Sequence, residues 1–357
     1  MKIIGIMSGT SLDGIDFCYV DLDTEIYQFD ILKAQTLPYP QEWVSILASA
    51  SEQSPEEVAR LNLTYTAYLN EMIHRFMATH QIKDLDLIAS HGHTIWHNPN
   101  AGYTLQIGNL DALNQGIKVP IVCDFRVQDV ALGGQGAPLV PIGDRLLFSA
   151  YDYCLNLGGF SNISFEVQQQ RIAFDISPVN TLLNYFSEQG FHLPYDKNGD
   201  LARQGAPHPA LIAQLNTVDY YQEQPPKSLG IESVKSIFIP MIEAFIDENK
   251  IAAKDVLASL VEHIAIQISN VLPKNESPKR ILVTGGGAYH QYLIEQLQHY
   301  ATPHQIHLPS AEIIEYKEAL IFALLGVLRF QNKVNVLASV TGAKTDHSSG
   351  KILRPSV

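Results

Sequence analysis

The sequence predicts an α/β protein made of two similar domains. The chain has 357 residues, which is more than one hydrophobic core usually organises. Apolar runs of strand length alternate with helical patterns, and this alternation is typical of layered α/β proteins. Residues 2–23 and 153–175 share one pattern, in which a strand, a turn of small residues and a second strand follow one another. The repeat indicates a duplicated unit, with chance similarity as the alternative.

The predicted elements follow in a similar order in both halves. Each half opens with a hairpin rather than a strand followed by a helix, which argues against a Rossmann domain and favours two similar domains that close over a cleft. Later in each half an apolar run ends in a turn of small polar residues, at residues 86–94 and 280–290. Helices are expected at residues 54–80, 178–190, 233–249, 252–272, 289–300 and 316–330. We place the first domain at residues 1–148, with residues 331–357 packed back on it, and the second at residues 149–330.

The composition excludes several classes of protein. A formal net charge of −13 disfavours binding to nucleic acid or to an anionic membrane surface. The longest apolar stretch, residues 319–328, is about half the length that spans a bilayer. Cys18, Cys123 and Cys154 are far apart and indicate neither a disulfide framework nor a zinc site. The apolar run at the start is too short for a secretory signal. We therefore expect a cytoplasmic protein with no nucleic-acid or membrane partner.

Residues 7–16, MSGTSLDGID, form the first glycine-containing turn. Its glycines let a ligand approach the backbone, and its amides and hydroxyls can surround phosphate oxygens. Asp13 can hold a magnesium ion through water. The segment is not a Walker P-loop, because it lacks GK[ST] and a strand follows it. The alternative is an ordinary polar hairpin turn.

Two further glycine turns follow strands in the second half. Gly158 and Gly159 precede Phe160-Ser161-Asn162, and residues 285–287 form a triple glycine after the strand ILVT. Each turn alone is a common hairpin or tight turn. The order of the three turns is more informative, because three strand–glycine elements at these intervals can form the walls and floor of one nucleotide cleft.

Two polar segments of the first half carry candidate ligand-binding residues. His91 and His93 would share one strand face, but no carboxylate or cysteine nearby completes a metal site. Polar contacts to a hydroxylated ligand, or a packed turn, are the favoured interpretations. Arg126 stands between Asp124 and Asp129, and this cluster either forms structural ion pairs or binds a substrate carboxylate through the planar guanidinium.

Two acidic segments of the second half also have alternative interpretations. Asp175 ends a strand just before a helix, so it is either a helix N-cap or a general base that faces the cleft. Residues 196–200, DKNGD, imitate the start of a calcium loop, but Leu201 and Pro207 stand where that loop requires glycine and glutamate. Two interpretations of this segment remain, a solvated turn and a loop that takes part in domain closure.

Together these segments resemble the anhydro-N-acetylmuramic acid kinase family, and the resemblance covers nearly the whole chain. Nine ordered matches are far more specific than any single motif. The matching segments are residues 7–16 (MSGTSLDGID), 90–97 (SHGHTIWH), 104–109 (TLQIGN), 123–141 (CDFRVQDVALGGQGAPLVP), 155–164 (LNLGGFSNIS), 195–205 (YDKNGDLARQG), 225–230 (PPKSLG), 283–288 (VTGGGA) and 339–343 (SVTGA).

The resemblance implies an actin-like ATPase fold of the sugar-kinase type, with two similar α/β domains flanking a nucleotide cleft. It also implies a reaction in which 1,6-anhydro-N-acetylmuramic acid, water and ATP give N-acetylmuramic acid 6-phosphate and ADP, with Mg²⁺ as cofactor. Such enzymes serve peptidoglycan recycling and are typically homodimers. A kinase for another anhydrosugar, such as levoglucosan, and a non-catalytic chaperone-like module that binds nucleotide are the alternatives.

The resemblance also implies roles for individual residues. Asp175 is implied as the catalytic residue. The implied ATP-binding residues are Gly9, Thr10, Ser11, Leu12, Asp13, Gly14, Gly158, Gly159, Asn162, Gly285, Gly286 and Gly287. The implied sugar contacts are Thr94, Gln106, Arg126 and Glu318. The sequence departs from the family at FDISPVN, where Ser177 and Val179 replace the two glycines of FDxGPGN. Since a β-branched valine resists positive φ, we expect a differently shaped turn there.

Overall fold

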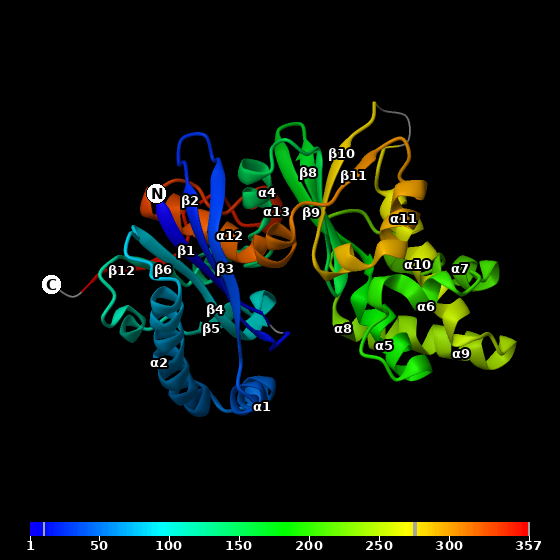
Figure 1. The fold of residues 1–357 in the computed structure, drawn as a ribbon, viewed down its shortest axis with the longest axis horizontal. Coiled ribbons are helices and arrows are strands. Elements are labelled where there is room, and N and C mark those ends of the chain that lie inside the picture. The colour runs from blue at the N-terminus through cyan, green and yellow to red at the C-terminus, as the bar shows by residue number, and fades with distance from the viewer. Residues whose placement is uncertain (10, 274–276, 356–357) are drawn as a thin grey trace. The chain divides into compact units, whose positions relative to one another are not determined.

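A computed structural model describes residues 1–9, 11–273 and 277–355. The chain divides into two compact units, each of which combines one sheet with helices (Figure 1). Unit 1 comprises Met1–Leu147 and Tyr316–Val357, and unit 2 comprises Phe148–Glu315.

The sheet of unit 1 has the strand order β12-β6-β4-β1-β2-β3, and β5 pairs with β4. Its strands are β1 (Lys2–Ser8), β2 (Gly14–Leu22), β3 (Phe29–Pro38), β4 (Leu87–Asn98), β5 (Tyr103–Ile107), β6 (Ile121–Cys123) and β12 (Lys351–Leu353). The first three strands form an antiparallel meander, whereas β4 runs parallel to both β1 and β6.

The sheet of unit 2 has the order β11-β10-β7-β8-β9. Its strands are β7 (Tyr153–Leu157), β8 (Phe160–Val167), β9 (Gln170–Pro178), β10 (Arg280–Thr284) and β11 (Gln305–His307). Strands β7, β8 and β9 form an antiparallel meander, and β10 runs parallel to both β7 and β11.

The two sheets therefore repeat one topology. In each, a three-stranded meander comes first in the chain, and its first strand then pairs with a later parallel strand that pairs with a further strand. The order β3-β2-β1-β4-β6 of unit 1 corresponds to β9-β8-β7-β10-β11 of unit 2. This correspondence confirms the predicted duplication and the predicted fold class, two similar α/β domains of the actin-like type.

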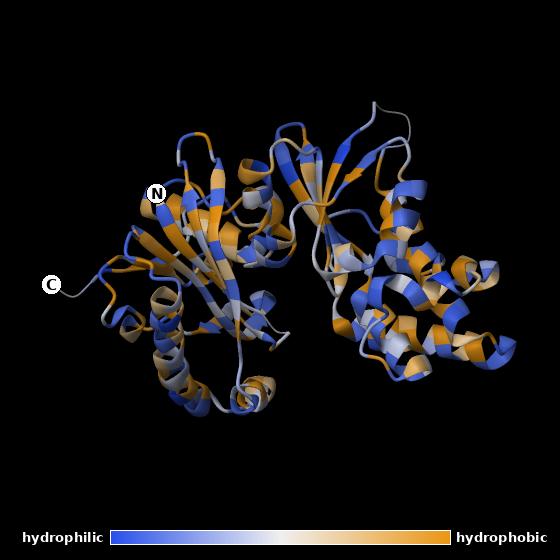
Figure 2. Ribbon diagram, viewed as in Figure 1, coloured by the Kyte–Doolittle hydropathy of each residue, from blue (hydrophilic) through white to orange (hydrophobic). Residues whose placement is uncertain are grey.

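The helices lie largely where the apolar periodicity predicts them. Those that begin in unit 1 are α1 (Gln41–Ser49), α2 (Pro55–Thr79), α3 (Val127–Ala131), α4 (Pro141–Leu147) and α13 (Ala338–Thr341). Those of unit 2 are α5 (Asn180–Phe191), α6 (Asp200–Arg203), α7 (Pro209–Leu215), α8 (Ile231–Ser233), α9 (Ile239–Asn249), α10 (Ala253–Asn270) and α11 (Gln291–Tyr300). Long helices such as α2 and α9 show both apolar and polar residues along their length (Figure 2), as amphipathic helices that cover a core do.

Helix α2 shows how local sequence fixes an element. The Ser54 side chain accepts a hydrogen bond from the Glu57 amide, while the Glu57 side chain accepts one from the Ser54 amide, and Pro55 takes the first helical position. This capping box satisfies backbone donors that would otherwise lack partners at the start of the helix. The buried face, which includes Tyr65 and Phe76, then packs into the core of unit 1.

The long helix α12 (Ala311–Phe330) differs from the prediction, which placed residues up to 330 in the second domain. The structure assigns residues 316–330 to unit 1. Gly5 on β1 and Gly326 on α12 explain this packing. A Cβ atom on Gly5 would collide with the Ala319 carbonyl, and one on Gly326 would lie 2.5 Å from the Ala89 side chain. These two glycines let α12 lie directly against β1 and β4.

In the part of the chain that the structure describes, no helix has both the length and the apolarity needed to cross a membrane.

Candidate active site

Two candidate residues of unit 2, Asn162 and Asp175, lie in one row across its sheet. Thr284 of β10 lies opposite Asn156 of β7, Asn156 lies opposite Asn162 of β8, and Asn162 lies opposite Asp175 of β9. Residues that oppose each other across a strand pair point to the same face, with Cβ atoms about 4.5–5.5 Å apart. The row therefore brings Asp175 beside Asn162, close to the turn that joins β7 to β8.

The segment 220–229 holds Asp175 by three hydrogen bonds. The Leu229 amide donates to Asp175 Oδ2 at 2.9 Å, and the Tyr220 hydroxyl donates to the Asp175 carbonyl at 2.6 Å. The Asp175 amide donates to the Lys227 carbonyl at 3.3 Å. In the described residues, Asp175 Oδ1 has no hydrogen-bond donor. The carboxylate is thus fixed through one oxygen while the other is left open.

The environment of Asp175 bears on its two predicted roles. Helix α5 begins after Val179, whose side chain makes no capping bond, so Asp175 does not cap it. Burial raises the pKa of Asp175 above the ordinary carboxyl value, and the hydrogen bond from Leu229 opposes this shift only in part. A half-buried carboxylate of raised pKa is suited to accepting a proton.

The glycine turns of unit 2 lie at the same end of the sheet as Asp175. Gly285 adopts a positive φ of 83°, and a Cβ there would lie 2.6 Å from Asn156 Oδ1. A Cβ on Gly287 would lie 2.7 Å from the Leu157 side chain. The triple glycine therefore packs closely against the end of β7. The structure brings the predicted residues Gly158, Gly159, Asn162, Asp175, Gly285, Gly286 and Gly287 together in unit 2.

The start of α5 completes this surface. The amides of Val179 and Thr181 donate to the Gly159 carbonyl, and the Asn180 amide donates to the Gly158 carbonyl. These contacts hold the β7–β8 turn against the first turn of the helix. Sequence reasoning did not single out Asn180 and Thr181 as site residues.

The first glycine turn, in unit 1, joins β1 to β2. Thr10 lies outside the described residues. Ser11 Oγ donates to Asp13 Oδ1 at 2.6 Å, and Leu12 has a positive φ of 59°. A Cβ on Gly9 would make only an ordinary contact with Ser11 Oγ, at 3.6 Å, whereas a Cβ on Gly14 would lie 2.6 Å from the Leu37 carbonyl. Close packing against β3 therefore explains Gly14, and Gly9 remains the glycine at which a ligand can approach the backbone.

A buried cluster of hydroxyl groups supports this turn. Ser8 Oγ lies 2.7 Å from Tyr39 Oη, 3.1 Å from Tyr65 Oη and 2.9 Å from His93 Nδ1. Burial lowers the pKa of His93 to about 4 and raises that of Tyr39 to about 12, so both groups are neutral near pH 7. The sequence pattern did not reveal this cluster, because its members come from three separate elements and the segment between β3 and α1.

The predicted sugar contacts lie in unit 1, where Thr94 and Gln106 touch. They oppose each other on β4 and β5, and Gln106 Nε2 donates to Thr94 Oγ1 at 3.3 Å and to Thr104 Oγ1 at 2.8 Å. Gln106 Oε1 is buried without a hydrogen-bond partner. A buried acceptor of this kind is costly unless a ligand or water satisfies it.

Arg126 is oriented by neutral groups. Its Nε donates to His91 Nε2 at 2.8 Å, and its Nη1 donates to the Gly136 carbonyl at 2.6 Å. Because His91 Nδ1 lies 2.9 Å from the Gly92 carbonyl, the ring carries its proton on Nδ1 and accepts through Nε2. Burial and the nearby Arg126 charge lower the pKa of His91 well below its usual value. The predicted ion-pair cluster is not seen among the hydrogen bonds of Arg126 in the described residues.

Glu318 on α12 is electrostatically linked to Arg126. Burial lowers the pKa of Arg126 to about 10, an effect that the negative charges of Glu318 and Asp129 oppose. Glu318 is exposed, and the positive charges of Arg126 and Lys317 favour its ionised form. Lys317 itself forms a buried ion pair with Asp144 at 2.7 Å. Unit 1 thus contains two groups of predicted sugar contacts, Thr94 with Gln106 and Arg126 with Glu318.

The histidine pair of β4 and the segment 196–200 are each held by contacts within their own unit. His91 and His93 have separate partners, and no group of three potential metal ligands occurs among residues 1–9, 11–273 and 277–355. Asp196 is buried, and its two carboxylate oxygens accept hydrogen bonds from the Leu201 and Ala202 amides at 2.9 Å each. Asp196 therefore fixes segment 196–200 to the start of α6, while Lys197 and Asp200 of the segment remain exposed.

Comparison with known proteins identifies the family. The family model described as anhydro-N-acetylmuramic acid kinase matches residues 1–355. The chain belongs to the anhydro-N-acetylmuramic acid kinase family. The kinase of this name from Mannheimia succiniciproducens is 34% identical, over 98% of this chain and 98% of that protein. The one from Haemophilus influenzae is 32% identical, over 98% of this chain and 97% of that protein.

Two solved structures of other families are distantly similar to this chain. Component A of the (R)-2-hydroxyglutaryl-CoA dehydratase from Acidaminococcus fermentans gives a TM-score of 0.48 at 11% identity, over 91% of this chain and 97% of that one. Xylulose kinase from Lactobacillus acidophilus gives a TM-score of 0.41 at 11% identity, over 99% of this chain and 94% of that one. The assignment to the anhydro-N-acetylmuramic acid kinase family does not depend on them.

The departure from the family motif after Asp175 is accommodated without left-handed backbone. Val179 has φ −124° and is fully buried, so the valine is not forced into positive φ. Ser177 is also buried, and its Oγ lies 3.0 Å from Ser161 Oγ, while its amide donates to that same oxygen at 3.1 Å. A serine pair across β8 and β9 thus occupies the place where the family motif has glycine.

Proposed function

We propose that this member of the anhydro-N-acetylmuramic acid kinase family is an ATP-dependent kinase that acts on 1,6-anhydro-N-acetylmuramic acid. It opens the anhydro bridge with water and phosphorylates O6, giving N-acetylmuramic acid 6-phosphate and ADP. The single observation that carries the proposal is the placement of Asp175. It lies in one row with Asn162, beside the glycine turns, with one oxygen fixed by Leu229.

Asp175 is proposed as the general base. Its open Oδ1 takes a proton from water as the water oxygen bonds to C1 of the sugar. The C1–O6 bond breaks, O6 keeps the electron pair and bonds to the γ-phosphorus of ATP, and ADP leaves. The water oxygen therefore ends on C1, and the bridge oxygen carries the phosphoryl group. General-base assistance is typically worth about 10²–10⁴ in rate.

We assign ATP to the predicted glycine-rich turns. Gly158, Gly159 and Asn162 are proposed to line the phosphates, and Gly285 to Gly287 the adenosine. In unit 1 the turn from Gly9 to Gly14 is proposed as the second phosphate turn. Backbone amides in such turns, and the start of a helix such as α5, favour phosphate oxygens.

Asp13 fits Mg²⁺ only as a partner held through water. Its carboxylate is exposed and accepts one hydrogen bond, from Ser11. A single exposed carboxylate matches the way Mg²⁺ is usually bound, by one or two carboxylates together with waters and phosphate oxygens. Bound there, Mg²⁺ would neutralise phosphate charge.

The sugar is assigned to the predicted contacts of unit 1. Gln106 Oε1 is a buried acceptor without a partner, which suits a sugar hydroxyl. Arg126 Nη2 has no hydrogen-bond acceptor among the described residues, so it can bind the lactyl carboxylate. This charge favours the muramic sugar over levoglucosan, which lacks a carboxylate. A cytoplasmic homodimer that serves peptidoglycan recycling completes the proposal.

A coupled assay of ADP release tests the function. Purified protein is given ATP and Mg²⁺ with 1,6-anhydro-N-acetylmuramic acid, with levoglucosan or with no sugar, and products are weighed by mass spectrometry. ADP release that depends on the muramic sugar, with its 6-phosphate as product, supports the proposal. Faster turnover of levoglucosan would favour the other anhydrosugar kinase, and ATP binding without sugar-stimulated turnover would favour a chaperone-like module.

A further inference from the structure

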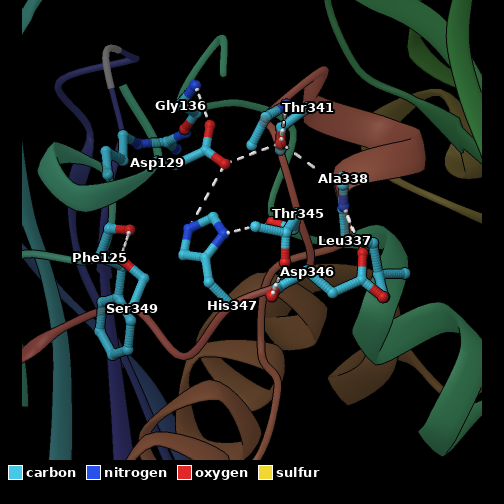
Figure 3. A network of polar contacts seen from close by, with 12 residues as sticks. Phe125, Asp129, Gly136, Leu337, Ala338, Thr341, Thr345, Asp346, His347 and Ser349 are labelled. Carbon is cyan, nitrogen blue, oxygen red and sulfur yellow. Dashed lines mark hydrogen bonds and ion pairs between the residues drawn. The ribbon is translucent and has the colours of Figure 1, made fainter. Parts of the chain in front are cut away.

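Asp129 occupies the centre of a buried network that joins two distant parts of unit 1. Its side chain is fully buried. Asp129 Oδ2 accepts a hydrogen bond from the Gly136 amide at 2.6 Å, and Oδ1 accepts one from Thr341 Oγ1 at 2.7 Å (Figure 3). His347 Nε2 lies 3.5 Å from Oδ1. The carboxylate therefore has partners on both oxygens and does not face a ligand.

The network fixes the loop that carries Gly136. The Thr341 carbonyl accepts a hydrogen bond from the Gln135 amide at 2.8 Å, and the Asp129 carbonyl accepts one from the Gly134 amide at 2.9 Å. A Cβ on Gly134 would collide with the Asp129 carboxylate. Three consecutive amides, those of residues 134–136, are thus held by Asp129 and Thr341.

Gly136 connects this network to Arg126. The amide of Gly136 is fixed by Asp129, and its carbonyl accepts the hydrogen bond from Arg126 Nη1. The position of that carbonyl decides where the guanidinium lies, together with His91 at Nε. Nε and Nη1 of Arg126 thus have acceptors within unit 1, and Nη2 is the nitrogen left to bind a ligand.

We propose that Asp129 and Thr341 are positioning residues, which act through Gly136 to aim Arg126 at the carboxylate of the sugar. The proposal rests on the proposed function, in which Arg126 recognises that carboxylate. It assigns a role to the segment around α13, whose Thr341 stands 212 positions after Asp129. Both oxygens of Asp129 are occupied, so the side chain acts on Arg126 through Gly136 and not on the sugar directly.

A double-mutant cycle tests the proposal. Thr341→Val keeps the shape of the side chain and removes the hydroxyl. We expect it to raise KM for the sugar about 3- to 30-fold with kcat nearly unchanged, because a contact made equally in the ground and transition states is weakened. In the Arg126→Ala background the same change should have no further effect on KM, and Thr341→Ser should restore it.

A matched control removes a buried hydroxyl elsewhere. Ser259 Oγ donates to the Asp255 carbonyl and accepts from the His208 amide, in unit 2. Ser259→Ala should lower the melting temperature without coupling to Arg126. If Thr341→Val is too unstable to purify, Asp129→Asn replaces it in the cycle. The proposal would be overturned if Thr341→Val changed KM equally in the wild-type and Arg126→Ala proteins, or changed it in neither.

A second readout does not depend on activity. In protein labelled with ¹⁵N-arginine, the Nε–H signal of Arg126 is identified by its loss in Arg126→Lys. Thr341→Val should shift that signal, whereas Ser259→Ala should leave it in place, and an unmoved signal in Thr341→Val would contradict the inference. The spectrum needs no turnover, so it tests the positioning of Arg126 separately from the reaction. If the proposed function is wrong, the wild-type protein will show no sugar-dependent ADP release.

Discussion

Asp175→Asn is the substitution that isolates the proposed base. Asparagine is nearly isosteric with aspartate but cannot accept the proton from water. Its Oδ1 can still accept the hydrogen bond that Leu229 donates, and the contacts of Tyr220 and Lys227 are made to the backbone of residue 175. The local structure should therefore persist while basicity is lost. We expect kcat to fall by about 10²–10⁴, the usual contribution of a general base.

Although Asp175→Asn should lose activity, we expect it to be at least as stable as the wild-type protein. The folded state raises the pKa of Asp175, so folding disfavours its charged form. Above the folded-state pKa this lowers the stability of the wild-type protein relative to a neutral side chain. The melting temperature of Asp175→Asn should therefore equal or exceed that of the wild type near pH 7. The difference should disappear as the pH falls below the ordinary carboxyl value, where Asp175 is protonated in both folded and unfolded chains.

The assay combines single-turnover kinetics with thermal unfolding and ATP binding. Asp255→Asn is the matched control, because Asp255 Oδ1 also accepts a backbone hydrogen bond, from the Ala206 amide at 2.8 Å, and has no proposed role in the reaction. Asp255→Asn should keep kcat. An Asp175→Asn protein with wild-type kcat would exclude Asp175 as the base, and so would a loss of rate that is matched by loss of folded protein.

Three further predictions follow from the same structure. Arg126→Ala should raise KM for the muramic sugar about 10- to 100-fold, because a hydrogen bond to a charged group contributes about 1.5–3 kcal/mol, and should change KM for levoglucosan little. Equal losses for both sugars would make Arg126 structural. Gly285→Ala should destabilise the protein by about 1–3 kcal/mol in denaturant unfolding, because φ is 83° and Asn156 Oδ1 fills the Cβ position. Unchanged stability would contradict this. As the pH is lowered, kcat/KM should fall when Asp175 becomes protonated, at a pH above the ordinary aspartate pKa of 3.8. The residual activity of Asp175→Asn should not show this fall at low pH.

The sequence was sufficient for features that depend on neighbours in the chain. The alternation of apolar residues predicted the hairpins at residues 2–23 and 153–175, and the repeat between them predicted the shared topology of the two sheets. Glycine after a strand predicted the turns, and in unit 2 the structure brings Gly158 and Gly285 to one end of a sheet beside Asp175. Strand length and side-chain period are local properties, so they can be read from a local pattern.

The sequence was insufficient where distant segments meet. Helix α12 is apolar on several faces, so its pattern could not show which core it joins, and residues 316–330 were placed in the wrong domain. The contact of Leu229 with Asp175 spans 54 positions and that of Thr341 with Asp129 spans 212. The flanking residues suggested ion pairs for Arg126, whereas its hydrogen bonds go to His91 and Gly136, from two other parts of unit 1. Each of these contacts depends on tertiary packing.

In the proposed reaction, water opens the anhydro bridge and the bridge oxygen receives the phosphoryl group. The direct measurement is a reaction run in H₂¹⁸O with unlabelled ATP and 1,6-anhydro-N-acetylmuramic acid, stopped early and analysed by mass spectrometry. Unlabelled product kept in H₂¹⁸O for the same time corrects for exchange at the anomeric carbon. We expect one ¹⁸O in the sugar portion of N-acetylmuramic acid 6-phosphate and none in its phosphoryl group. Labelled inorganic phosphate together with unphosphorylated sugar would contradict this expectation.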